Sequence, residues 1–150
     1  MRDKNGVEIR TGDVVRVSNA YFKNDNGLYF VAHSPDDPSW SGRDHSLTRI
    51  CRNGKLSKGK YNIAFWPLSA FVNDRWKRAE ADAWNREHAE IEIVSVPDKT
   101  EIIESFRKEA ELAEYWIERG TYNWGEYHPE VVRNKKIRDF YLGVAERLSA

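Results

Sequence analysis

YNIAFWPLSAFVNDRWKRAEADAWNREHAEIEIVSV, residues 61–96, combines the patterns of a strand, a helix and a second strand in one continuous run. Residues 61–66 alternate between the two faces of a half-buried strand, and Pro67 ends it because proline cannot donate a ladder hydrogen bond. Apolar residues then recur every three or four positions, which predicts an amphipathic helix over about 74–89. The β-branched residues of 91–96 predict that the chain returns to the sheet.

Shorter strands are predicted on the N-terminal side of this run. Alternating valines at 14–18 and the apolar run 28–32 predict a hairpin, and 46–52 predicts a further strand. The segment Gly12-Asp13-Val14-Val15-Arg16-Val17 resembles the opening strand of SH3-like barrels of the KOW type, found in transcription and translation factors. That resemblance implies a bent antiparallel SH3-like sheet or barrel. We therefore expect an α+β protein whose residues 1–96 form an SH3-like β domain with an inserted helix.

Residues 97–150 change to helix-forming composition and predict a helical hairpin packed on that domain. Asp98 is the expected N-cap of the first helix, with Glu101 three positions later as in a capping box. The first helix has one apolar stripe, expected to be buried and to include Trp116, and Gly120 is the expected C-terminal stop. Pro129 opens the second helix.

Size and composition limit the classes of function. The 150 residues carry 24 Lys plus Arg and 24 Asp plus Glu, so no overall field draws the chain to nucleic acid or to an anionic membrane. No apolar run approaches the roughly 20 residues of a membrane span. Cys51 is the single cysteine, which excludes an internal disulfide and agrees with a cytoplasmic location. We expect Cys51 to be a small buried hydrophobe.

Aromatic residues are abundant, with six Trp, seven Tyr and six Phe. Loops are expected to present four of them, and exposed aromatics are typical of protein interfaces: Trp40, Tyr122, Trp124 and Tyr127. The first helix adds acidic residues that suit a basic partner surface. The pattern favours a non-enzymatic protein that binds another protein and needs no metal or cofactor; whether the chain also forms homo-oligomers stays open. In size, charge and lack of a catalytic motif the chain resembles small accessory proteins of phages and mobile elements, including inhibitors of bacterial defence systems.

Two alternatives stay open. Nucleic-acid or nucleotide binding would use the basic, aromatic region 43–66. Its candidate residues are Arg43, Arg49, Arg52, Lys55, Lys58, Lys60 and Trp66. A metal-dependent enzyme would use the polar loop 33–45, where imidazole and carboxylate groups are concentrated. The groups in that loop are His33, Asp36, Asp37, Asp44 and His45.

Overall fold

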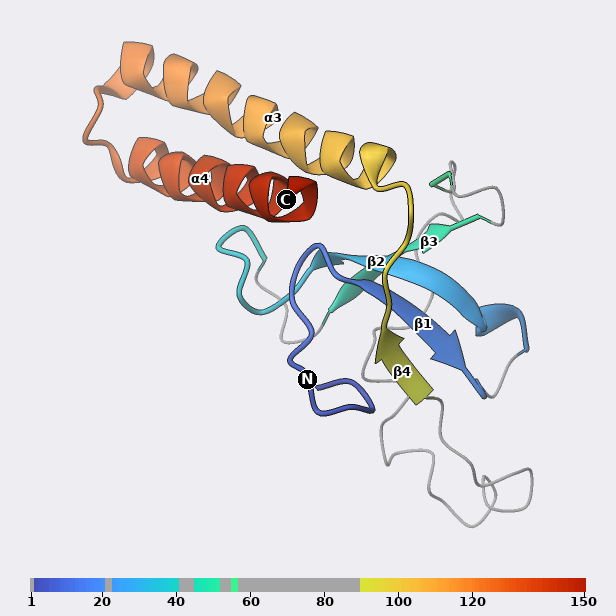
Figure 1. Cartoon of the computed structure of the whole chain (residues 1–150). Helices are drawn as coiled ribbons and strands as arrows, with labels where there is room; N and C mark the ends of the chain where they lie inside the picture. The colour runs from blue at the N-terminus through green and yellow to red at the C-terminus, as the bar shows by residue number, and fades with distance from the viewer. Residues whose placement is uncertain (1, 21–22, 41–44, 52–54, 57–89) are drawn as a thin grey trace. The chain divides into compact units, whose positions relative to one another are not determined.

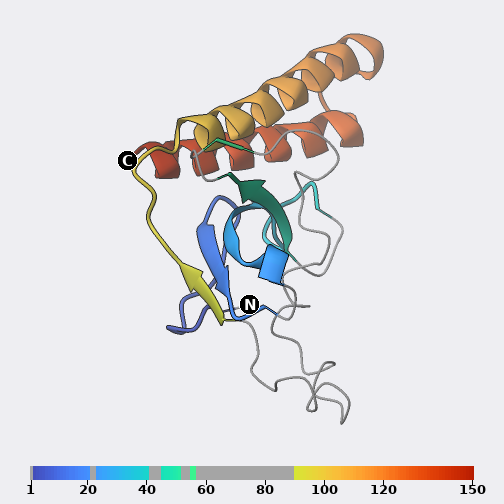
Figure 2. The same cartoon turned by 90° about the vertical axis from the view of Figure 1, so that its right-hand side faces the viewer.

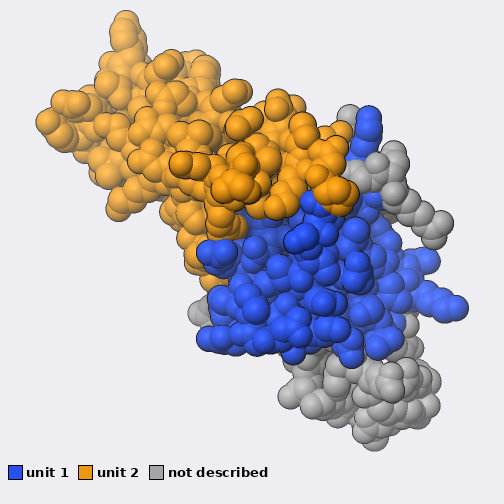
Figure 3. All heavy atoms as spheres, in the orientation of Figure 1, with its two compact units in different colours: residues 1–34, 42–96 blue, residues 35–41, 97–150 orange. Residues whose placement is uncertain are grey.

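A computed structural model shows a small antiparallel sheet and two long helices (Figure 1). The structure describes residues 2–20, 23–40, 45–51, 55–56 and 90–150. The predicted α+β class is confirmed. The predicted strand at 61–66 and helix at 74–89 lie outside the described residues. The chain divides into two compact units, residues 1–34 with 42–96 and residues 35–41 with 97–150 (Figure 3).

Four strands form the described sheet of the first unit. They are β1 (Val14–Ser18), β2 (Gly27–His33), β3 (Ser46–Ile50) and β4 (Glu90–Ile93), joined in the order β3-β2-β1-β4 with every pair antiparallel. The predicted β1–β2 hairpin is confirmed, and so is the return of the chain to the sheet at β4. Because β3 and β4 are the two edges of the described strands, this sheet is open and the term barrel does not fit it.

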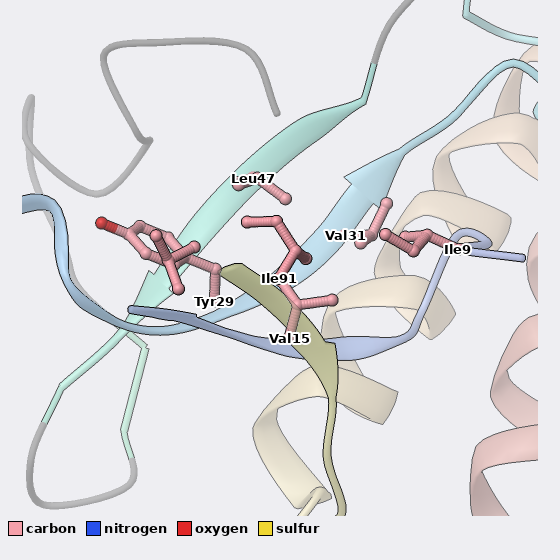
Figure 4. Packing of buried hydrophobic residues seen from close by; sticks show 7 residues of the cluster. Ile9, Val15, Tyr29, Val31, Leu47 and Ile91 are labelled. Atoms are coloured by element: carbon pink, nitrogen blue, oxygen red, sulfur yellow. The ribbon is translucent and has the colours of Figure 1, made fainter. Parts of the chain in front are cut away.

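One buried apolar cluster of the first unit lies on one face of the sheet (Figure 4). Val15 is paired with Tyr29 on one side and with Ile93 on the other, and Val31 is paired with Leu47. Since side chains alternate between faces along a strand, this register places the apolar residues of all four strands together. The buried cluster consists of Ile9, Val15, Val17, Tyr29, Val31, Leu47 and Ile91.

Asp3 fixes the N-terminal turn to the edge strand β4. Its Oδ1 accepts hydrogen bonds from the backbone N–H groups of Asn5 (2.9 Å) and Val7 (3.0 Å), and its Oδ2 accepts one from Ile93 (3.0 Å). The Ile93 N–H is the main cause that holds the pKa of Asp3 below its ordinary value, with the Val7 and Asn5 N–H groups adding to it. The ionised carboxylate is therefore part of the folded structure.

Helices α3 (Thr100–Trp124) and α4 (Pro129–Ser149) form the predicted hairpin in the second unit and run side by side (Figure 2). Their buried residues include Ile102, Phe106 and Ile117 on α3 and Tyr141 and Val144 on α4. Phe106 and Tyr141 stack with ring centroids 5.9 Å apart. None of the helices in the described ranges has an apolar stretch of the length and hydropathy that crossing a membrane requires.

Gly120 does not end α3, and the prediction of a stop there was wrong. It lies inside the helix and is buried, and a Cβ added to it would stand 2.7 Å from Cγ2 of Val131 on α4. The glycine therefore allows the two helices to approach each other closely. The helix ends one turn later at Gly125, whose φ of +90° disfavours other residues.

The start of α3 also differs from the prediction by one residue. The N-cap is Lys99 and not Asp98, although Oδ1 of Asp98 accepts a hydrogen bond of 2.9 Å from the N–H of Thr100. The start of α4 follows the sequence signal, with Pro129 in the first turn. There the Nδ1 atom of the N-cap His128 accepts a hydrogen bond of 3.2 Å from the N–H of Glu130.

The segment 35–41 belongs to the helical unit through a buried polar contact with α4. The Tyr141 hydroxyl donates to Oδ2 of Asp37 at 2.7 Å and lies 2.6 Å from the Ser39 hydroxyl. Oδ1 of Asp37 accepts from the Ser39 hydroxyl (2.7 Å) and from its backbone N–H (2.8 Å). Burial is the main cause that raises the pKa of Tyr141, so the phenol stays protonated and keeps donating.

Candidate functional site

The four aromatics predicted to bind a partner all lie in the helical unit. Tyr122 is 91% exposed, Tyr127 86% and Trp124 61%, while Trp40 is half-buried within the segment 35–41. Tyr122 and Trp124 lie in the last turn of α3 and not in the interhelical loop, so their predicted location was wrong. Tyr127 is in the loop as predicted. Trp124 stacks on His128 with the ring centroids 4.8 Å apart.

A second apolar stripe on α3 extends this exposed group toward the middle of the helix. Leu112 is 52% exposed, Trp116 50% and Tyr115 46%, and it is their grouping into one exposed apolar patch that is informative. Together with Arg119 and Tyr122 they recur every three or four residues, the spacing of one helix face. We call this set the aromatic face: Leu112, Tyr115, Trp116, Arg119 and Tyr122.

Contacts between neighbours order the middle of the aromatic face. The rings of Tyr115 and Trp116 meet edge to face with centroids 5.1 Å apart. The Arg119 guanidinium lies 5.7 Å from the centroid of the Tyr115 ring and donates a hydrogen bond of 2.8 Å to its hydroxyl. These side chains hold one another in place, which lowers the entropy lost when a partner binds.

Acidic residues border the aromatic face. A shallow hollow on α3 is lined by Glu118, Arg119, Tyr122 and Asn123. Glu104, Glu111 and Glu118 are exposed and spaced by seven residues, so they form a line along the helix. Glu118 is three residues after Tyr115 and four before Tyr122, which places the line directly beside the two tyrosines.

Sequence reasoning missed the aromatic face because it assigned only one apolar stripe to this helix. The buried positions of α3 are Ile102, Phe106, Ala110, Ala113, Ile117 and Gly120. Trp116 was expected among them, and this was wrong, because it lies one residue, or roughly 100° of helix rotation, away from Ile117. The signal that reveals the second face is the run of aromatic and leucine residues at 112, 115, 116 and 122.

Two of the residues that the nucleic-acid alternative would use, Arg49 and Lys55, lie in the part of the chain that the structure describes. The Arg49 guanidinium on β3 forms hydrogen bonds within its own unit. Its Nη1 donates to the carbonyl of Asn24 at 2.6 Å and its Nη2 to that of Asn26 at 2.9 Å. It also lies over the Tyr29 ring, 5.3 Å from the centroid. Lys55 is exposed, and its carbonyl accepts from the Cys51 N–H at 2.8 Å. Arg43, Arg52, Lys58, Lys60 and Trp66 lie outside the described residues.

Residues of the metal-site alternative make structural contacts. Nε2 of His45 is 3.1 Å from the carbonyl oxygen of Ile9, and Asp37 accepts the bonds from Tyr141 and Ser39 described above. Asp44 lies outside the described residues. In the described ranges, no three His, Cys, Asp or Glu side chains gather closely enough to hold a metal ion.

Cys51 is exposed directly after β3, so the expectation that it is buried was wrong. The strand ends at Ile50, and the alternation that would have turned the thiol inward does not continue to Cys51.

Comparisons with protein-family models, with curated proteins and with solved structures gave no match to this chain.

Proposed function

We propose that the chain is a non-enzymatic binding protein whose helical hairpin binds another protein through the aromatic face of α3. The observation that carries this proposal is the exposure of Tyr115, Trp116 and Tyr122 on one side of a single helix. Contiguous exposed aromatics are costly in water and are enriched at protein interfaces. Trp, Tyr and Arg, the residue types that dominate binding energies, are all present here.

The charge around the aromatic face supports a protein partner over a nucleic acid. Helix α3 carries six glutamates, Glu101, Glu104, Glu109, Glu111, Glu114 and Glu118, against three bases, Arg107, Lys108 and Arg119. Phosphate groups would be repelled by this surface, whereas a basic protein surface would be attracted. The likeness in size and balanced charge to inhibitors encoded by phages and mobile elements supports a partner that the chain blocks by occupying its surface. The single cysteine supports a cytoplasmic setting.

Affinity capture with matched variants tests this function. The full chain is immobilised and incubated with a nuclease-treated bacterial lysate, beside Tyr122→Ala and the control Leu142→Ala. Both side chains are exposed on the same hairpin, but Leu142 lies on α4. We expect a protein that wild type and Leu142→Ala retain and that Tyr122→Ala loses by about tenfold or more, as at an interface hot spot. Equal capture by all three would contradict the proposal, and a salt-sensitive oligonucleotide complex would favour the nucleic-acid alternative.

A further inference from the structure

We infer that the partner presents one amphipathic helix to the aromatic face, with an apolar stripe bordered by lysine and arginine. This inference rests on the proposed function and adds the chemistry of the partner. Three features of α3 carry it: the spacing of the apolar residues, the line of glutamates beside them, and the ion pairs formed elsewhere on the hairpin.

The spacing matches the seam of a coiled coil. Leu112, Tyr115, Arg119 and Tyr122 are separated by three, four and three residues, the a and d positions of a heptad repeat. The run covers roughly 15 Å of helix at about 1.5 Å per residue. A partner helix of two heptads is long enough to cover this run. An extended strand has no such match, because its side chains repeat every two residues and not every three or four.

The charge of the glutamate line favours a basic partner. Counted in the same heptads, Glu104, Glu111 and Glu118 all occupy g positions, which flank the seam and select partners by charge. Within the described part of the chain none of the three forms an ion pair. Glu114, three residues after Glu111 and four before Glu118, lies next to this line, and it is paired with Arg138 of α4 at 2.8 Å. The hairpin therefore uses its inner acid itself and presents an outer row of acids to a basic partner.

A second copy of the chain fits this face less well than a basic partner helix does. Two α3 helices packed antiparallel would place glutamate lines opposite each other, and like charges repel. Packed parallel, they would place Glu111 and Glu118 opposite Trp116 and Asn123, without a cation. The exposed residues of α4 mix both charges and include Val132, Arg133, Lys136, Asp139, Leu142 and Glu146.

Designed peptides test the inference on the full chain. The probe is a fluorescein-labelled peptide of about 18 residues, with leucine at the a and d positions and lysine at e and g. One comparison peptide has glutamate at e and g, and another has a proline at its centre, which breaks the helix. Fluorescence anisotropy measures the affinity of each peptide for the wild-type chain and for its variants. Light scattering measures the oligomeric state of the chain alone.

The variants separate local from overall charge. Glu111→Lys with Glu118→Lys reverses the glutamate line, and Glu126→Lys with Glu146→Lys makes the same change in net charge at exposed sites off α3. We expect wild type to bind the lysine peptide at least about tenfold more tightly than either comparison peptide, and less tightly as salt rises. Reversal of the glutamate line should remove that preference, while the control pair keeps it within about twofold.

Several results would overturn the inference. They are equal binding of the lysine and glutamate peptides, equal binding of the proline peptide, equal effects of the two variant pairs, and no binding of any peptide. Light scattering could also show that the chain dimerises. If the double variant Glu111→Lys with Glu118→Lys abolished or strengthened that dimer, the aromatic face would bind a second copy. None of the peptide results would contradict the proposed function, which fails if Tyr122→Ala captures its protein as well as wild type.

Discussion

The Tyr141 hydroxyl on α4 donates a hydrogen bond of 2.7 Å to Oδ2 of Asp37, a residue more than a hundred positions earlier in the chain. Both groups are buried, and the contact joins the segment 35–41 to the hairpin that presents the aromatic face. A buried carboxylate that loses a donor keeps its desolvation cost without compensation. The contact therefore contributes to the stability of the helical unit.

Tyr141→Phe tests this contribution. The ring and its stacking on Phe106 remain, but Oδ2 of Asp37 loses the hydrogen bond from Tyr141, so we expect the free energy of unfolding to fall by about 1–3 kcal/mol. Tyr122→Phe is the control, since its hydroxyl is exposed and its removal should change stability by less than about 0.5 kcal/mol. Urea unfolding measures both. Equal small losses in the two variants would show that the Tyr141–Asp37 bond adds no stability.

The two glycines within the helices predict opposite responses to the same substitution. Gly143 on α4 faces open space, so Gly143→Ala should stabilise the protein by about 0.5–1 kcal/mol through helix propensity. At Gly120 the new Cβ would stand 2.7 Å from Val131, so Gly120→Ala should destabilise it by about 1–3 kcal/mol. Thermal and urea unfolding of the two variants check the signs. A gain in stability for both would contradict close packing of α3 on α4.

We expect ionisation of Asp3 to make part of the free energy of unfolding depend on pH. Its pKa in the folded protein lies below the ordinary value of 3.8, chiefly because of the Ile93 N–H, so its contribution is present above the unfolded pKa. The contribution is lost as the pH falls through the folded pKa. We expect Asp3→Asn to be less stable than wild type near neutral pH and the gap to narrow in acid. A gap that is independent of pH in urea unfolding would show that ionisation of Asp3 is not involved.

Arg49 distinguishes a structural role from a phosphate-binding role. Arg49→Lys keeps the charge, but an ammonium cannot reproduce the fork that contacts Asn24 and Asn26. We expect a loss of about 1–3 kcal/mol in urea unfolding, since these are charge-assisted bonds. Unchanged stability, with weaker binding to a single-stranded oligonucleotide, would instead support the nucleic-acid alternative.

The sequence predicted the described elements well where the pattern was periodic and local. The valines of β1, the apolar strand β2 and the β-branched β4 alternate in sequence, and the structure pairs them as expected. Both helices of the hairpin were predicted, because apolar residues recur at helical spacing and proline marks one of the starts.

The errors arise where a residue's role depends on a distant neighbour. Glycine is a common residue at helix ends, but Gly120 lies inside α3, where it contacts Val131 of α4. The segment 35–41 looked like a loop of the β domain, and nothing local to it indicates that Tyr141 holds it in the helical unit. For the candidate site, Tyr122, Trp124 and Tyr127 of the expected partner-binding set are exposed and Trp40 is half-buried, while Tyr115 and Trp116 were missed because only one stripe was assigned to α3.

Site-specific photo-crosslinking tests the central claim most directly, namely that the aromatic face of α3 is where a partner protein binds. A photoreactive phenylalanine analogue replaces either Tyr122 on the aromatic face or Glu146 on α4, both exposed. The full chain is irradiated in a nuclease-treated lysate. We predict a discrete protein adduct from position 122 and none from position 146, with Trp116→Ala reducing the adduct by about tenfold as expected for a hot spot. Adducts of equal yield at both positions, or an adduct to nucleic acid alone in an untreated lysate, would contradict the account.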